Sequence, residues 1–135
     1  MSYKIEDIEG IGPAFGQKLS MAKIETTEDL LALCDSAKGR AAVSKTTGIS
    51  EAQLLKWANM ADLMRISGIG SEYSELLEAA GVDTVKELRN RNAANLAAKI
   101  AEVNAAKKLT RTTPSTEVVQ GWIGNAAQLP PIITY

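Results

Sequence analysis

The sequence contains no histidine, a single cysteine (Cys34), and only two Trp, three Tyr and one Phe in 135 residues. Because histidine is absent and cysteine occurs only once, the sequence excludes metal sites built on His or Cys clusters. It also excludes catalytic triads that use histidine as the base. One cysteine cannot form a disulfide within the chain, and it suits the reducing cytoplasm. No run approaches the roughly 18 apolar residues of a membrane span, and the first residues lack the basic and apolar regions of a signal peptide. We therefore expect a soluble, cytoplasmic protein without a cofactor or membrane partner.

An excess of charge of either sign is also absent, because 15 Lys and Arg face 16 Asp and Glu. A net charge of −1 creates no overall positive field, so nucleic-acid binding would have to come from a local site. Signs of catalysis are few. No carboxylate pair falls in a segment expected to form a buried cleft, and Cys34 has no histidine to activate it. We expect a protein that is not an enzyme.

An internal repeat organises the chain. Residues 8–31 match residues 66–89 at a constant offset of 58, with eight identical positions that include both Gly-Ile-Gly sequences, at 10–12 and 68–70. After an insertion of about seven residues, a weaker match extends to Trp57 and Trp122. The repeat predicts two units, at residues 1–64 and 65–129, followed by a C-terminal tail at 130–135.

Helical patterns fill both units. Pro13 suits the first position of a helix, and Phe15, Leu19 and Ala22 then share one face. Further start and stop signals are capping boxes at Thr84 and Ser50, a weaker relative at Thr26, an N-cap at Asn92 and a C-terminal glycine at Gly81. The longest expected helix covers residues 93–109. No segment alternates apolar and polar residues as a strand does, so the predicted fold is all-α, with two pseudo-repeated units in one compact or saddle-shaped body.

Two features are open to more than one interpretation. Trp57 and Trp122 lie among apolar helix residues, which favours core packing over stacking on a base or partner. After Pro130 and Pro131 the tail cannot continue a helix, and it is either loosely docked or a small contact segment.

The repeated glycine turn carries the clearest motif. Residues 8–16 and 66–74 resemble the helix-hairpin-helix motif, in which two glycines allow positive φ and a sharp turn. The isoleucine between them can fill the space between the helices, and Gly16 or Ser74 permits their close approach. Such a turn points backbone N–H groups outward at a helix N-terminus, a geometry that can hold a phosphate.

Over residues 3–129 the chain resembles an uncharacterised bacterial family of tandem helix-hairpin-helix proteins, catalogued as a domain of unknown function. It is also similar to the paired-hairpin DNA-binding modules of repair enzymes. That similarity implies sequence-independent contact with the DNA backbone through the glycine turns. Hairpins of this kind often carry a basic residue two places after the second glycine, where this sequence has Ala14 and Glu72.

The candidate backbone-binding residues are two turns and a group of basic side chains: Gly10, Ile11, Gly12, Ala14, Lys18, Gly68, Ile69, Gly70, Arg89, Arg91, Lys99, Lys107, Lys108 and Arg111. The first turn is the better phosphate candidate, since Glu72 would repel a phosphate at the second. Two simpler explanations remain open: the glycines only make tight helix joints, and the basic residues form a solvated helix face. The alternative function is a protein-interaction adaptor that keeps the fold without binding nucleic acid.

Overall fold

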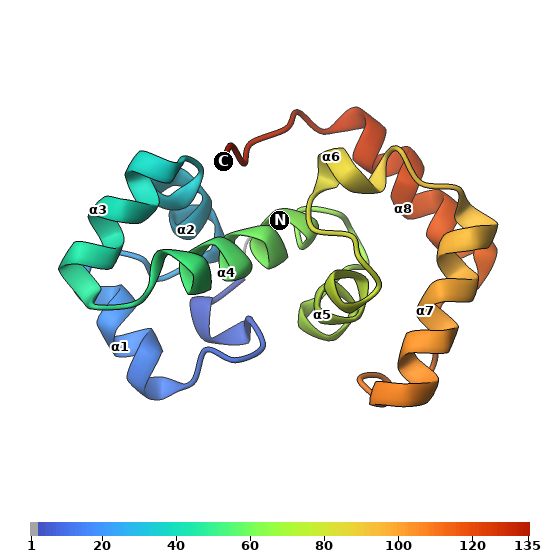
Figure 1. Cartoon of the computed structure of the whole chain (residues 1–135), viewed down its shortest axis with the longest axis horizontal. Coiled ribbons are helices and arrows are strands. Elements are labelled where there is room, and N and C mark those ends of the chain that lie inside the picture. Colours follow the sequence, from blue (N-terminus) through green and yellow to red (C-terminus); the bar gives the residue numbers. More distant parts are fainter. Residues whose placement is uncertain (1–2) are drawn as a thin grey trace.

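The computed structural model describes residues 3–135, which form eight α-helices after a short 3-10 turn, η1 (Ile5–Asp7). The predicted all-α fold is confirmed, and within this range the only strand-like feature is an isolated bridge between Lys4 and Thr26. The helices are α1 (Pro13–Met21), α2 (Thr27–Cys34), α3 (Ala37–Thr47), α4 (Glu51–Leu63), α5 (Ser71–Ala79), α6 (Val85–Leu88), α7 (Ala93–Lys107) and α8 (Thr116–Gln128). Figure 1 shows α1–α3 at one end, α6–α8 at the other, and α4 and α5 between them. The first predicted unit starts at residue 1, so residues 1 and 2 lie outside the described range.

Most of the predicted helix signals are found at the helix ends, but among the described residues Ser50 and Thr84 are N-caps without the reciprocal bond of the predicted capping boxes. Pro13 is the first residue of α1, and the side chains of Ser50, Thr84 and Asn92 accept N–H bonds as N-caps. The Thr26 motif is a full reciprocal capping box with Asp29.

The long helix α7 ends at Lys107, two residues before the predicted end. Lys108 adopts a left-handed φ of 53°. The Asn104 side chain then both donates to the Thr110 carbonyl and accepts from the Thr110 N–H. A side chain that binds the following loop in this way competes with continued helix.

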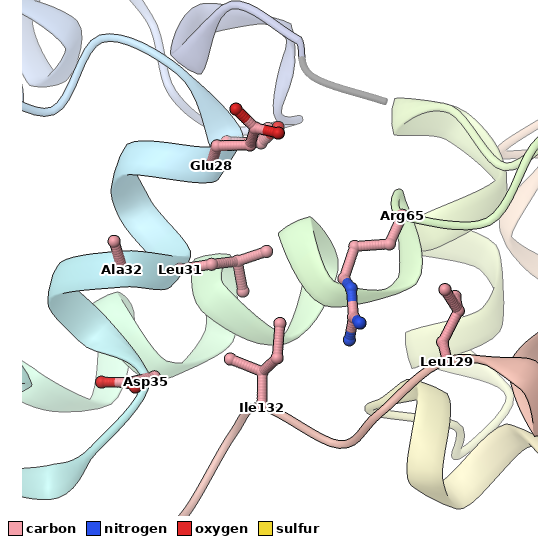
Figure 2. A pocket seen from close by; sticks show the side chains of 8 residues that line it. Glu28, Leu31, Ala32, Asp35, Arg65, Leu129 and Ile132 are labelled. Carbon is pink, nitrogen blue, oxygen red and sulfur yellow. The ribbon is translucent and has the colours of Figure 1, made fainter.

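The tail is docked, and it returns to the opposite end of the molecule. From α8 it crosses to α2 and α3, where the Thr134 N–H donates to the Asp35 carbonyl at 2.7 Å. The Arg40 side chain, 4% exposed, donates to the carbonyls of Thr134 at 2.6 Å and Cys34 at 2.9 Å. Leu129 and Ile132 line a cavity beside α2, and Figure 2 shows Ile132 facing Leu31 of that helix, with Leu129 on the far side near Arg65. The tail therefore connects the two groups of helices.

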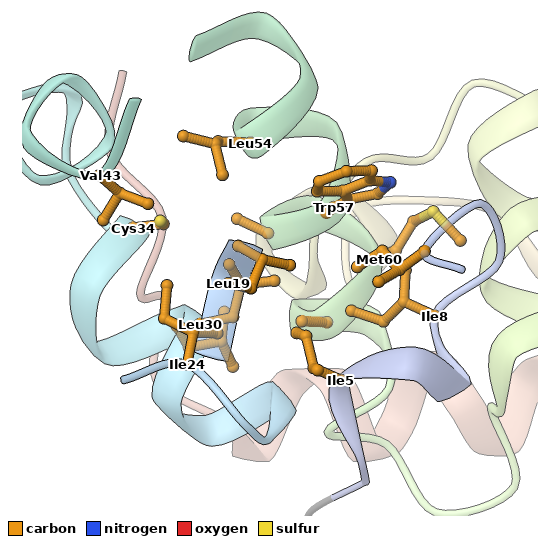
Figure 3. Packing of buried hydrophobic residues seen from close by; sticks show 14 of the residues in the cluster. Ile5, Ile8, Leu19, Ile24, Leu30, Cys34, Val43, Leu54, Trp57 and Met60 are labelled. Atoms are coloured by element: carbon orange, nitrogen blue, oxygen red, sulfur yellow. The ribbon is translucent and has the colours of Figure 1, made fainter. Parts of the chain in front are cut away.

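The buried apolar side chains form two clusters rather than one. The first gathers residues from η1 through α4 and includes Leu19, Leu30 and Trp57 (Figure 3), together with Ile133 of the tail. The second draws on residues 63–126, from the end of α4 to α8. Helix α4 belongs to both, because Met64 at its C-cap packs in the first cluster and Leu63 in the second.

A buried carboxylate joins the two groups of helices at the end of α4. Asp62 is fully buried and accepts the Val85 N–H at the start of α6 at 2.8 Å. It also pairs with Arg65, whose guanidinium donates to the Pro130 carbonyl at 2.9 Å. Buried charge is tolerated only where partners satisfy it, and here those partners are the Val85 N–H of α6 and the Arg65 guanidinium, which also binds the tail.

Candidate nucleic-acid interface

The first glycine turn lies between η1 and α1. Gly10 has a φ of +94°, a conformation that side chains disfavour. The Ile11 N–H donates to the Ile8 carbonyl at 3.1 Å, which closes the turn, and the Ile11 side chain is buried in the first cluster. Gly12 and Ala14 are exposed. Ile11 can therefore reach a ligand only through its backbone, while its side chain holds the turn in place.

The second turn has matching geometry 58 residues later. Gly68 has a φ of +93°, the Ile69 N–H donates to the Ile66 carbonyl at 3.1 Å, and the Ile69 side chain is fully buried. Gly70 is partly exposed. The two Gly-Ile-Gly sequences thus adopt the same backbone conformation.

Each turn rests on a buried tryptophan. A Cβ built at Gly10 would lie 3.6 Å from the Trp57 indole nitrogen, and one at Gly68 would lie 3.4 Å from that of Trp122. Each indole also packs against an aromatic ring of the helix that follows the turn. The ring centroids of Trp57 and Phe15 lie 5.2 Å apart, and those of Trp122 and Tyr73 lie 5.3 Å apart. Both tryptophans are buried, which agrees with the predicted core role and leaves neither free to stack on a base.

The helix that follows the first turn begins with open backbone donors. Gly12 is the N-cap of α1 and supplies no side-chain cap, and the first turn of the helix holds no acidic residue. Within residues 3–135, the N–H groups of Ala14 and Phe15 have no acceptor. These donors and the positive end of the helix dipole favour an anion at this position.

Helix α5 begins differently. Its N-cap, Gly70, also lacks a side-chain cap, but Glu72 lies in its first turn. The buried Ser71 hydroxyl has no hydrogen-bond partner among the described residues. The Glu72 carboxylate offsets the helix dipole, so the second turn is the weaker anion site.

Charges of both signs surround the first turn. Lys18 is exposed, with its ammonium 5.7 Å from the centre of the Phe15 ring. On the side facing α5, a cleft of about 380 Å³ holds the carboxylates of Glu9, Glu75 and Glu78 and two lysines, Lys56 and Lys107. Burial, and then the nearby Glu9, raise the pKa of Glu75. The cleft itself is therefore a poor place for a phosphate.

The predicted basic group is spread along the second half of the molecule. Arg89 and Arg91 precede α7, whereas Lys107 is its last residue and Lys108 and Arg111 follow it. A helix of 15 residues separates the two sets by about 20 Å. Two of the charges have partners, since Arg91 pairs with Glu87 and Lys99 with Glu102. The fold brings only Lys107 to the cleft beside the first turn.

Sequence reasoning missed three charged residues that matter to the fold, Arg40, Asp62 and Arg65. A signal existed for Asp62, which interrupts the apolar end of α4 with a carboxylate and is followed by Arg65 one turn later. No local pattern marks Arg40, whose partner Thr134 lies 94 residues away.

Other kinds of site find little support in the described part of the chain. Across residues 3–135, no three His, Cys, Asp or Glu side chains come together in a way that could hold a metal ion. None of the helices in that range combines the length and apolar character needed to cross a membrane.

The architecture defines an all-helical domain in which two glycine turns of the same geometry each precede a helix N-terminus. The chain belongs to a family described as a domain of unknown function, DUF4332, whose family model matches residues 9–129. No solved structure matches the chain.

Proposed function

We propose that this protein is a non-catalytic helix-hairpin-helix module that binds the sugar-phosphate backbone of DNA without reading its sequence, chiefly through the first glycine turn. The observation that carries the proposal is the start of α1. An exposed glycine cap there leaves the Ala14 and Phe15 N–H groups without acceptors, and no carboxylate lies in the first helical turn.

Phosphate binding follows from the donors available at that position. A phosphate oxygen at the N-terminus of α1 would accept from the free backbone N–H groups and interact favourably with the helix dipole. Gly12 allows close approach because it has no side chain, and Lys18, one turn further along, adds a positive charge. Backbone phosphates carry no sequence information directly, so such binding is indifferent to sequence.

The second turn and the basic residues near α7 have secondary roles in this proposal. Glu72 weakens the second turn as a phosphate site. Lys107, Lys108 and Arg111 lie at the end of α7, the same end that reaches the cleft beside the first turn. They are the basic residues best placed to support a duplex bound there.

Fluorescence anisotropy on a generic labelled duplex tests the proposal. If two phosphates are contacted, affinity should fall about tenfold between roughly 50 and 200 mM salt, and equally for duplexes of different sequence. Gly12→Asp should abolish binding because its carboxylate occupies the free N–H groups and repels phosphate. No atom lies within 4 Å of a Cβ at Gly12, and its φ of −87° suits aspartate, so the variant should fold.

Two matched variants control for added charge. Ala41→Asp places the same charge on an exposed face of α3 and should bind almost as wild type. Gly70→Asp changes the second turn and should weaken binding less than Gly12→Asp. Equal losses for Gly12→Asp and Ala41→Asp would contradict a specific role for the first turn.

A protein-interaction adaptor is the second candidate, favoured by the three carboxylates of the cleft beside the first turn. Such a surface repels DNA. A folded wild-type protein that fails to bind duplex at low salt would contradict the DNA proposal and favour the adaptor.

A further inference from the structure

We propose that the cavity between α2 and the C-terminal tail binds a small zwitterion with an aliphatic body, such as a free aliphatic amino acid. The cavity has a volume of about 380 Å³, at the small end of the range for small-molecule sites. None of its lining residues belongs to either glycine turn, so this inference is independent of the proposed function.

A guanidinium held in a fixed orientation forms one wall. The Arg65 side chain is 14% exposed, and its Nη1 donates both to Asp62 Oδ1 at 2.8 Å and to the Pro130 carbonyl at 2.9 Å. Within residues 3–135 the Nε and Nη2 groups have no acceptor. This free edge of the guanidinium is the fork that binds a carboxylate with two parallel hydrogen bonds.

The opposite wall carries the opposite charge. Glu28 and Asp35 lie at the two ends of α2, seven residues or about 10 Å apart along the helix axis. Figure 2 shows the Arg65 guanidinium extending toward Ile132 in the space between α2 and the tail, while the Asp35 carboxylate points away from that space. Glu28 is therefore the carboxylate better placed to bind a ligand ammonium while the ligand carboxylate binds Arg65.

Between the charged walls the lining is apolar. Leu31 on α2 and Ile132 on the tail face the same space in Figure 2. A branched aliphatic body would bury apolar surface against them.

The balance of charge selects a zwitterion over a simple anion or cation. Two carboxylates and one guanidinium line the cavity, so a plain carboxylate would be repelled by Glu28 and Asp35. A plain amine would leave the free edge of Arg65 without an acceptor. Only a ligand that carries both groups satisfies both walls.

A titration of the full-length protein followed by backbone amide NMR tests the inference, with L-leucine as the probe. Leucine should cause saturable shifts at the α2 and tail residues that line the cavity. N-acetyl-L-leucine, which lacks the ammonium and resembles a peptide C-terminus, and 3-methylbutylamine, which lacks the carboxylate, should each bind about tenfold or more weakly. Leucine shifts that are absent at millimolar concentration, or lie elsewhere, would overturn the inference. N-acetyl-L-leucine binding as tightly as leucine would overturn the ammonium part and assign the site to a peptide C-terminus.

Variants at Arg65 and Glu28 test whether these two side chains bind the ligand. Arg65→Lys retains a positive charge but loses the fork, and it should weaken leucine binding about tenfold. Because Arg65 also holds Asp62 and the tail, Glu28→Gln is a second variant on an exposed residue, expected to weaken leucine but not N-acetyl-L-leucine. Glu117→Gln, an exposed acidic residue in the first turn of α8, is the matched control and should bind leucine unchanged. Equal leucine affinity in Glu28→Gln and wild type would contradict the assigned role of Glu28.

Discussion

At the scale of single residues, Arg40 connects the end of α2 to the tail, although no local sequence pattern marks it for this role. Its buried guanidinium bridges the carbonyl at the end of α2 and a carbonyl of the tail. We predict that Arg40→Met lowers the free energy of unfolding by about 2 to 4 kcal/mol, because the buried Cys34 carbonyl and the partly buried Thr134 carbonyl both lose a charged donor. Urea denaturation measures this. Lys38→Met, on an exposed position of the same helix, should change stability little, and an equally small change for Arg40→Met would disprove the bridging role.

Asp29 makes stability depend on pH. The Glu25 N–H donates to the Asp29 carboxylate at 3.0 Å. This hydrogen bond is the main reason why the pKa of Asp29 lies below its ordinary value of 3.8. A carboxylate whose pKa is lower in the folded state stabilises the fold above the unfolded-state pKa, and this contribution is lost as the pH falls through the folded-state pKa. We predict that Asp29→Asn flattens the fall in melting temperature below about pH 4. Asp7→Asn, outside the capping box, should leave the acid profile as in wild type.

At the scale of elements, the first turn offers a matched pair of glycines. Gly10 has a φ of +94°, whereas Gly12 has a φ of −87° and open space around a built Cβ. We predict that Gly10→Ala destabilises the protein by about 1 to 2 kcal/mol through backbone strain, while Gly12→Ala is close to neutral. Chemical denaturation of both variants tests this. Similar effects would mean that the turn does not depend on positive φ at Gly10.

The same turns show why aromatic residues recur at equivalent positions. Each tryptophan packs both against a glycine of the turn and against the aromatic ring of the following helix. The tryptophan therefore determines how the turn and the next helix are placed relative to α4 or α8. Loss of the indole would remove support from both.

At the scale of the whole molecule, the tail holds the two groups of helices together. Ile133 packs in the first cluster, although residue 133 follows α8 of the opposite group. We predict that deleting residues 130–135 destabilises the protein by at least about 2 kcal/mol and speeds hydrogen exchange in α2 and α3 more than in α7. Tyr135→Ala, at a side chain that is 73% exposed, is the control and should change neither measurement, because it keeps the Thr134 peptide carbonyl that Arg40 binds. Uniformly faster exchange across all helices would contradict this local role of the tail.

Much of the local structure could be predicted from the sequence. Pro13, Ser50, Thr84 and Asn92 mark helix starts because a cap acts over three residues, a distance that the sequence itself displays. Positive φ in each Gly-Ile-Gly turn was also predicted, although only the first glycine of each pair, Gly10 or Gly68, adopts it. Such contacts need no knowledge of the rest of the fold.

The distribution of charge across the surface could not be predicted in this way. Arg89 and Lys107 are close enough in sequence to suggest one basic group, yet α7 holds them apart. Glu9 and Glu75 are distant in sequence but line the same cleft. Which of the predicted site residues lie near one another therefore depends on how the helices pack.

By itself the sequence determined the helical class, the helix caps and the two glycine turns, because each depends on residues a few positions apart. Only the tertiary structure decided where the tail docks and what satisfies Arg40, Asp62 and Arg65. Their partners lie up to 94 residues away, and no short-range pattern specifies a contact whose geometry exists only after α4 and α8 have packed.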